Sequence, residues 1–409
     1  MKIFGIPVAE YKKRRDNLLK SIPDKSLLII PSNYNSFSNL APYRQDSNFI
    51  YFSGYEHDKS YLLFYKHSKQ ALSILLTEEN DPVMELWVGK RPDLQDIKKD
   101  YLFDRVLPNK KFDNLMSQLL PGIENLLFHF PSEDYNVLGV ERVLAKRLIE
   151  KYPHLKMASA TAYIASLRRE KSKNEIAQIS KAIEITKMGI LNAVKEITPG
   201  KNEYKVQAAL EFGFRYNGSR NNAFQSIIAS GINSTTLHYE ENNSVIPEKS
   251  VILFDVGSEY NYYASDISRT FPTSKKYTKK AKSLYKAVLN TQKAVIEEMK
   301  PGKTFGELNE LTKKLLAKEM KKLGYIKEDS EISKYYYHGV SHPIGLDVHD
   351  ITSSPELVEG DVISCEPGLY VKEDKIGIRI EDDVLITKNG ARVLSDIIPK
   401  EINDIENLF

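Results

Sequence analysis

The sequence has one cysteine, no long apolar run and no excess of either charge, and each shortage excludes a class of protein. Cys365 stands alone among 409 residues, which excludes an internal disulfide and suits a reducing cytoplasm. No apolar run approaches the ~20 residues that cross a bilayer. The basic cluster near the N-terminus follows a short apolar run, the wrong order for a signal peptide. We therefore expect a cytoplasmic protein with no membrane partner.

Neither sign of charge dominates the composition. Lysine and arginine together number 58 and the acidic residues 55, a net charge of +3. The charges are interspersed, so no basic footprint for nucleic acid is present and no nucleic-acid partner is expected. A composition of 41% hydrophobic and 28% charged residues is ordinary for a globular protein. The length predicts about two or three domains.

The first part of the chain, to about residue 168, alternates strand and helix patterns. It predicts a small α/β domain that carries neither a phosphate loop nor a nucleophile elbow, so we interpret it as a scaffold or oligomerisation domain. Its expected elements are helices at 11–21 and 136–152 and strands at 26–30, 49–54, 60–65 and 71–76. The polar stretch 166–173 leads into Ser172 and Glu175 at capping-box spacing, which predicts domains 1–168 and 169–409.

The second part reads as an internal repeat. Pro199-Gly200-Lys201 lies between an apolar helical pattern after Ser172 and a helix at 203–216, and a strand at 224–230, His238 and a hairpin follow. Pro301-Gly302-Lys303 lies between helices at 278–299 and 305–323, and His342 and a second hairpin follow. Two related halves are implied. We expect an α+β domain whose antiparallel strands are covered by helices.

The first hairpin places two aspartates in an apolar, aromatic context, ILFDVGSEYNYYASDISRTF at 252–271. A turn centred on Tyr260-Asn261 would put Asp255 directly opposite Asp266 on one sheet face. Opposed Cβ atoms lie ~4.5–5.5 Å apart. Two like charges at that distance need a proton or a cation between them.

The second hairpin repeats this geometry in EPGLYVKEDKIGIRIEDD. A turn centred on 373–374 places Glu366 opposite Glu381, with Arg379 on the same face, although Pro367 must bend or bulge the first strand. A surface ion-pair ladder would explain one such pair. Two pairs in two repeats favour a metal-bridging site.

Histidines cluster between the hairpin carboxylates. The segment YYYHGVSHPIGLDVHD contains His338, His342 and His349. The first two have the HxxxH spacing of zinc proteases, but that motif requires a helix with glutamate after the first histidine, where this chain has Gly339. Four carboxylates and one histidine instead suit two divalent ions ~3.5–4 Å apart. Oxygen-rich ligation favours Mn²⁺, with Co²⁺ or Zn²⁺ as alternatives, and a water bridging such ions becomes a nucleophile for hydrolysis.

These segments resemble the metal-site segments of the pita-bread metallopeptidases, most closely the Xaa-Pro aminopeptidase (aminopeptidase P) branch. The stretch NLAPYRQDSNFIYFSGY resembles the N-terminal domain of that branch, and the resemblance extends over nearly all 409 residues. Two departures concern the pocket rim: Pro343 stands where family members often have an aromatic residue, and the loop at 371–376 is short. They bear on substrate length and on the preferred first residue rather than on the ligands.

The resemblance implies a ligand set for two metals. It makes Asp255 a ligand of one ion, His342 and Glu366 ligands of the other, and Asp266 and Glu381 bridges between them. It also gives Glu366 the general-base role for the bridging water.

The resemblance further implies roles in catalysis and substrate binding. His349 would hydrogen-bond the scissile carbonyl and stabilise its developing charge. His238 and His338 would line the pocket for the imino-acid ring, and His238 would also be a catalytic residue. Arg379 would hold the metal carboxylates.

The expected activity is removal of an N-terminal residue that precedes proline, by attack of a metal-bridging hydroxide. A prolidase restricted to Xaa-Pro dipeptides would use the same ligands. A metal-free peptide-binding module of this fold is the alternative of another class, and it would be expected to lose ligands that this chain keeps. The resemblance also implies a homodimer or homotetramer formed partly through the N-terminal domain.

Overall fold

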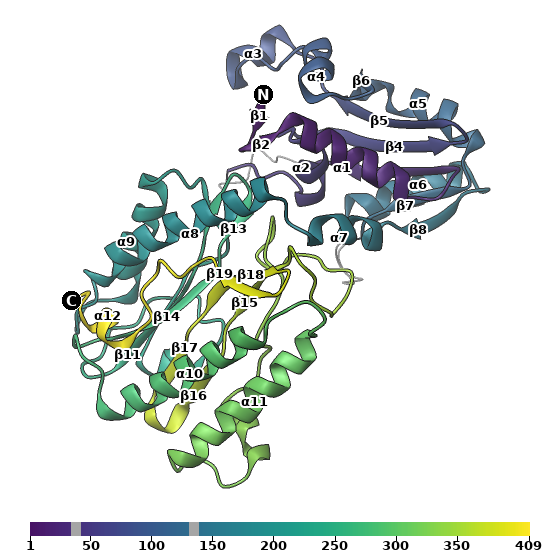
Figure 1. Cartoon of the computed structure of the whole chain (residues 1–409). Helices are drawn as coiled ribbons and strands as arrows, with labels where there is room; N and C mark the ends of the chain where they lie inside the picture. The colour runs from purple at the N-terminus through teal and green to yellow at the C-terminus, as the bar shows by residue number, and fades with distance from the viewer. Residues whose placement is uncertain (34–41, 131–138) are drawn as a thin grey trace. The chain divides into compact units, whose positions relative to one another are not determined.

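The chain divides into two units, Met1–Arg168 and Arg169–Phe409. The computed structural model describes residues 1–33, 42–130 and 139–409 (Figure 1). The first residues of the helix predicted at 136–152, and residues 39–41 of the stretch resembling the N-terminal domain, lie outside this description. No helix among the described residues is long and apolar enough to cross a membrane.

A six-stranded mixed sheet organises the first unit. The strand order is β6-β5-β4-β3-β7-β8, with β4 antiparallel to both of its neighbours and the other pairs parallel. The sheet consists of β3 (Ser26–Pro31), β4 (Tyr61–His67), β5 (Gln70–Thr77), β6 (Arg105–Pro108), β7 (Asn125–Phe128) and β8 (Lys156–Ser159). A separate two-stranded sheet contains β1 (Lys2–Ile3) and β2 (Ile6–Pro7).

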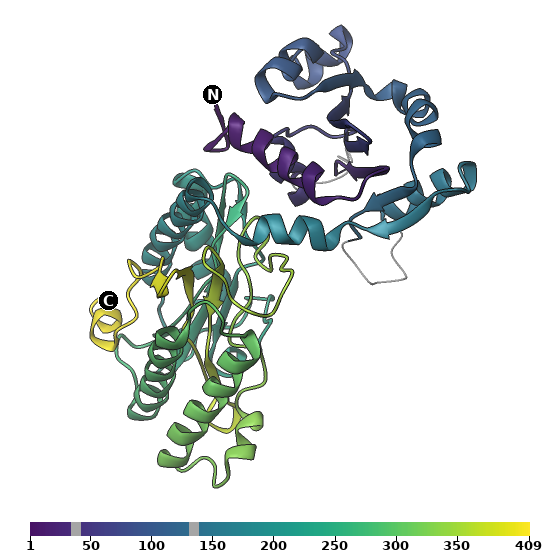
Figure 2. The ribbon, with the colours of Figure 1, turned by 45° about the vertical axis from the view of Figure 1, so that its right-hand side comes forward.

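Helices accompany this sheet as the sequence pattern predicts for an α/β unit. Helix α1 packs on β4 and β5 and is the long purple helix of Figure 2. Helix α6 packs on β3, β7 and β8. The helices are α1 (Val8–Ser21), α2 (Ser47–Ser53), α3 (Pro82–Val88), α4 (Leu94–Tyr101), α5 (Phe112–Leu119), α6 (Val140–Lys151) and α7 (Thr161–Arg169), with 3-10 turns η1 (Asn109–Lys111) and η2 (Leu120–Gly122).

One predicted strand of the first unit is wrong, because residues 49–54 belong to helix α2 and its cap. Asp46 is the N-cap and its side chain accepts a hydrogen bond from the Phe49 N–H. Gly54 closes the helix in the left-handed conformation, with φ of 65°. Every residue of this helix is buried, so its apolar run has no polar face that would reveal a helical period.

The second unit contains four long helices and several small antiparallel sheets. In the view of Figure 1 the strands run between helix pair α8–α9 and helix pair α10–α11. The helices are α8 (Lys173–Val194), α9 (Glu203–Tyr216), α10 (Lys279–Glu298), α11 (Phe305–Lys322) and α12 (Ile402–Glu406), with η3 (Gly231–Thr235), η4 (Asp329–Lys334) and η5 (Lys372–Asp374). The capping box predicted for Ser172 and Glu175 is present at the start of α8.

The described strands of this unit form three three-stranded sheets and one two-stranded sheet. The orders are β10-β11-β14, β15-β18-β19, β13-β12-β9 and β16-β17. The strands are β9 (Asn221–Asn222), β10 (Ile227–Ser230), β11 (Val251–Val256), β12 (Ser258–Tyr260), β13 (Tyr263–Ala264), β14 (Ile267–Pro272), β15 (Val362–Cys365), β16 (Gly368–Val371), β17 (Ile376–Arg379), β18 (Asp382–Thr387) and β19 (Gly390–Val393). The α+β layout of the second domain is confirmed.

The two Pro-Gly-Lys turns show the repeat at the level of the backbone. Gly200 and Gly302 have φ of 86° and 89°, a region that favours glycine. Gly200 donates its N–H to Ile246, whose own N–H returns to Lys201 at 2.8 Å. Gly302 and Lys303 make the same two bonds with Leu357, a residue of the second half. The sequence repeat is therefore a structural repeat.

The second hairpin has the predicted register and the first does not. Leu369 pairs with Ile378 and Cys365 pairs with Asp382, so the flanking ladders place Glu366 opposite Glu381. In the first hairpin Asp255 pairs with Ser268 instead of Asp266. The turn lies one position later than predicted.

The conformation of the turn explains this shift. Asn261 and Tyr262 both have positive φ, 49° and 75°, and Tyr260 pairs with Tyr263. A two-residue hairpin loop of type I′ requires positive φ at both central positions, where asparagine is favoured. Because a shift of two residues in the pairing preserves the alternation of faces, Asp255 and Asp266 still lie on one side of the hairpin.

We expect Gly302→Ala to lower the free energy of unfolding by about 1–2 kcal/mol, because a Cβ at positive φ is strained. Gly306, four residues later in α11, is the matched control. Its added Cβ would meet only the Thr304 Oγ1 atom at 3.9 Å, so Gly306→Ala should stabilise the helix by about 0.5 kcal/mol. Urea unfolding of both variants measures the difference. If both substitutions changed the free energy of unfolding equally, backbone strain at Gly302 would not explain the result.

Candidate metal centre

A cavity of ≈ 380 Å³ in the second unit contains all of the predicted site residues. Five carboxylates, four histidines and one arginine line it: the nine predicted residues Asp255, Asp266, Glu366, Glu381, His238, His338, His342, His349 and Arg379, together with Glu240, which the sequence analysis did not predict. Apolar side chains also line the wall, namely Phe224, Ile227, Leu237 and Val348. The cavity therefore combines a strongly acidic floor with apolar sides.

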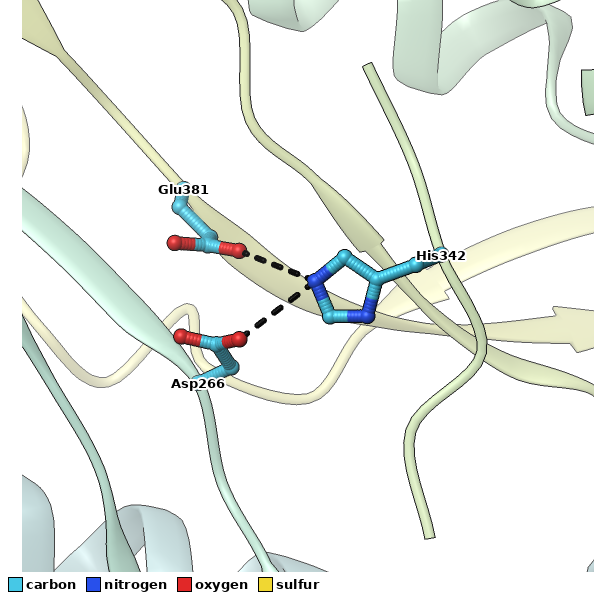
Figure 3. Close-up of side chains that lie close together, drawn as sticks. All are labelled: Asp266, His342 and Glu381. Atoms are coloured by element: carbon cyan, nitrogen blue, oxygen red, sulfur yellow. Dashed lines mark ion pairs between the residues drawn. The ribbon is translucent and has the colours of Figure 1, made fainter. Parts of the chain in front are cut away.

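Asp266, His342 and Glu381 form the tightest group in the cavity (Figure 3). The Nε2 atom of His342 lies 3.4 Å from Asp266 Oδ2 and 3.9 Å from Glu381 Oε1. Asp266 directly precedes β14, Glu381 directly precedes β18, and His342 comes from the loop before β15. Side chains from three distant parts of the sequence thus bring their possible ligand atoms close together.

Glu366 is the fourth side chain close to this group. Its Oε1 atom lies 3.4 Å from His342 Nε2. The backbone explains the proximity: the Glu366 N–H donates to Val340 and the Ser364 N–H donates to His342, each at 2.9 Å. The histidine loop therefore runs along β15 like an additional strand.

Asp255 enters the site from β11, beside Arg379. Arg379 is almost fully buried and donates through Nη2 to Asp255, through Nε to Ser268 Oγ at 2.7 Å and through Nη1 to Tyr370 Oη at 3.0 Å. The Ser268 hydroxyl in turn donates to Glu381 Oε2 at 2.8 Å. One guanidinium therefore ties the first hairpin to the second.

The contacts of His338 define its tautomer. Its Nδ1 atom lies 2.7 Å from the Gly339 carbonyl oxygen, which only accepts, so Nδ1 carries the proton. Its Nε2 atom then accepts from the Tyr370 hydroxyl at 2.8 Å, while that hydroxyl accepts from Arg379. Burial, assisted by the Arg379 charge, lowers the pKa of His338 to about 4. His338 is therefore neutral at physiological pH.

His349 and His238 lie at the open side of the cavity, and both are exposed. The His349 ring packs edge-on against the His342 ring, with centroids 4.3 Å apart. Partial burial and the neighbouring His342 lower the pKa of His349. His238 belongs to the loop after η3 and makes no contact with the Asp266 group that the described structure records.

Burial and mutual repulsion raise the pKa values of the clustered carboxyl groups. Burial raises the pKa of Glu381 to about 7, with repulsion from Asp255 as the next cause. Burial and the Glu381 charge raise the pKa values of Asp266 and Glu366 well above their ordinary range. The Oδ1 atom of Asp266 is buried without a hydrogen-bond partner. Divalent cations fit this donor set, because they supply the missing partner and relieve the repulsion.

The sequence analysis missed three residues that support this centre: Ser268, Tyr370 and Asp383. The carboxylate of buried Asp383 accepts the Asp266 backbone N–H at 3.2 Å, and burial raises its pKa well above the ordinary range. Alternation along the strands offered a signal for Ser268, which lies two residues from Asp266 and shares its face. No local signal marks Tyr370 or Asp383, because their partners lie far away in the sequence.

Comparison with known proteins identifies the family. The model of metallopeptidase family M24 matches residues 177–388, and the model of the aminopeptidase P N-terminal domain matches residues 11–128. The chain belongs to metallopeptidase family M24. The M24 match spans the acidic cavity and both halves of the repeat, so the two-domain pita-bread fold and the metallopeptidase class expected from the sequence are confirmed.

Relatives and solved structures agree with this assignment over the full length. The Xaa-Pro aminopeptidase of Haemophilus influenzae is 30% identical, covering 99% of this chain and 98% of that protein. The Xaa-Pro aminopeptidase of Escherichia coli K12 is also 30% identical, covering 98% and 97%. A structure of E. coli aminopeptidase P in its low-pH form matches with a TM-score of 0.89 at 30% identity, covering 98% of both chains. A zinc-substituted form of that enzyme with product matches at 0.90 and 29% identity, with the same coverage.

Membership in the M24 family implies a hydrolase that uses divalent metal ions. The acidic cavity is the place in the described chain where carboxylates and a histidine converge in the way such ions require.

We expect the metal-free protein to lose stability as the pH rises from about 5 to about 8. The folded protein holds protons on carboxyls such as Glu381, whose pKa is about 7, whereas the unfolded chain has released them, so raising the pH favours unfolding. Glu381→Gln should reduce this loss by up to ~1.4 kcal/mol per pH unit. Urea unfolding in a chelator measures it. The control is Glu196→Gln, which changes an exposed carboxylate paired with Lys201. If the free energy of unfolding of the metal-free wild-type protein does not change with pH, the interpretation that buried carboxyl groups hold protons is wrong.

Proposed function

We propose that this M24 enzyme is a dinuclear exopeptidase that releases an N-terminal residue preceding proline. The observation that carries the proposal is the group of Asp266, Glu381 and His342, with Glu366 beside His342 and Asp255 in the same cavity. Relatives named Xaa-Pro aminopeptidase that match nearly the whole chain support the substrate class.

We propose for these side chains the ligand roles that the family resemblance implies, and their convergence in one cavity supports this proposal. Asp255 would bind one ion, His342 and Glu366 the other, and Asp266 and Glu381 both ions. When bound, the pair of ions would polarise a peptide carbonyl and lower the pKa of water at the site. Oxygen-rich ligation favours Mn²⁺, with Co²⁺ or Zn²⁺ as alternatives.

The remaining residues would bind the peptide and move protons. Glu366 would hold the proton released at the site. The partly exposed position of His349 beside His342 suits a donor to the scissile carbonyl. Neutral His338 and the apolar wall suit a proline ring, and His238 would close the open side of the pocket. Arg379 would orient Asp255 while Ser268 orients Glu381.

A prolidase limited to dipeptides is the second candidate, because it would need the same carboxylates and histidine. The full-length likeness to Xaa-Pro aminopeptidases favours the aminopeptidase.

A peptide panel tests the proposal. We expect the Mn²⁺-loaded protein to release the first residue from Xaa-Pro-Yaa peptides but not from Xaa-Ala-Yaa, as measured by chromatography of the products. Asp266→Ala should lower turnover at least ~10²-fold, because a lost ligand costs more than a lost outer partner. Cleavage of dipeptides alone would establish the prolidase. An absence of cleavage with Mn²⁺, Co²⁺ and Zn²⁺ would refute both.

We further propose that the first unit mediates self-association into a dimer or tetramer. Helix α3 exposes Leu86 and Trp87 by 87% and 82%, respectively, an unusual exposure for such large apolar side chains. We expect the double substitution Leu86→Ser and Trp87→Ser to reduce the mass measured by light scattering toward the 46.8 kDa of one chain. Tyr216→Ser, at an exposed aromatic of the second unit, should leave the mass unchanged. A wild-type protein that is already monomeric would refute the proposal.

A further inference from the structure

Gln292 of α10 lies behind the candidate metal centre and is fully buried. Its Nε2 atom donates to two backbone carbonyls, to Cys365 at 3.2 Å and to Ile380 at 3.1 Å. These residues directly precede Glu366 and Glu381 in the chain. One side chain therefore holds the backbone immediately before both carboxylates of the second hairpin.

The orientation of this amide is fixed by Lys400. The Nζ atom of Lys400 lies 3.1 Å from Gln292 Oε1. An ammonium group can only donate, so the amide oxygen must face Lys400 and both N–H groups must face the carbonyls. Lys400 is held in turn by buried Asp382.

The chain has a specific need for a donor at Ile380. The register of β16 and β17 places Pro367 opposite Ile380, and the Ile380 N–H donates to the Pro367 carbonyl at 3.4 Å. An antiparallel pair of this kind exchanges two hydrogen bonds, but proline has no N–H to return. A buried carbonyl without a donor would cost about 1–3 kcal/mol. The Gln292 amide provides the missing donor.

In this register the two glutamates form the non-hydrogen-bonded pair next to Pro367 and Ile380, so their N–H groups point away from each other, toward neighbouring segments. The Glu366 N–H donates to Val340 in the histidine loop, and the Glu381 N–H donates to Ser268 in β14. The Gln292 amide therefore holds the backbone at the residue before each glutamate. A displacement of the backbone at either residue would change the distance between the two carboxylates.

We propose that Gln292 is a positioning residue for the metal centre, in which its amide replaces the hydrogen bond that Pro367 cannot make and fixes Glu366 and Glu381 relative to one another. The inference rests on the ligand roles proposed above. Gln292 does not line the cavity, so it acts only through the backbone.

The test is Mn²⁺ binding to Gln292→Met, which keeps the length of the side chain and removes both donors. In calorimetric titration of the metal-free protein we expect the Kd for Mn²⁺ to rise at least ~10-fold, the usual effect of losing an outer partner of metal ligands. At saturating Mn²⁺ we expect kcat to fall while KM for the peptide stays within about twofold, because the pocket wall is untouched.

Two further variants separate positioning from general destabilisation. Val288→Ala truncates a buried side chain one turn earlier on the same helix and leaves the two hydrogen bonds of Gln292 in place. It should lower the unfolding free energy without changing the Kd. Gln292→Glu keeps the contact with Lys400 and loses at least one hydrogen-bond donor, so it should also raise the Kd for Mn²⁺. This variant replaces Gln292→Met in the test if the methionine variant does not fold.

A rescue experiment addresses the hydrogen bond itself. Pro367→Ala restores an N–H opposite Ile380, so in the Gln292→Met background it should recover part of the lost Mn²⁺ affinity. A wild-type Kd in either Gln292 variant, an equal loss in Val288→Ala, or no recovery in the double variant would overturn the inference. If the proposed function itself were wrong, the wild-type protein would bind no divalent ion, and this result differs from every outcome that overturns only the role of Gln292.

Discussion

The repulsion among buried carboxylates is the constraint on which the rest of the catalytic unit depends. Asp266, Glu381 and Asp383 are almost completely buried near one another, and burial raises the pKa of each. Such a group destabilises a folded chain unless protons or cations neutralise it. The surrounding structure therefore has to hold the carboxylates close together against their own repulsion.

The supporting contacts come from opposite halves of the repeat. Arg379 of the second hairpin binds Asp255 of the first, and Ser268 of the first binds Glu381 of the second. The repeated units are similar in their Pro-Gly-Lys turns and hairpins, but the histidine loop runs along β15 of the second half and brings His342 to the site. Two similar halves thus create an asymmetric centre, as the two inequivalent ions proposed above would need.

Local patterns were sufficient for the elements whose physical cause is local. The Ser172 capping box, the helix from Glu203 to Tyr216 and the turn of the second hairpin follow from residues near in sequence, and all three agree with the structure. The strand expected at 49–54 failed because a fully buried helix has no polar face. The first hairpin was placed two residues out of register because the left-handed φ values of Asn261 and Tyr262 decided the turn.

The sequence by itself determined the family, the repeat and the nine predicted residues that line the cavity. These features could be recognised because carboxylates and histidines recur at similar spacings in an apolar context, where such side chains need a partner. Only the tertiary structure decided how those residues are held. Tyr370, Asp383 and Gln292 act through contacts with distant parts of the chain, and a single sequence contains no record of which distant backbone groups lack a partner. The need for Gln292 arises from a proline in another strand, a relation that exists only after the chain has folded.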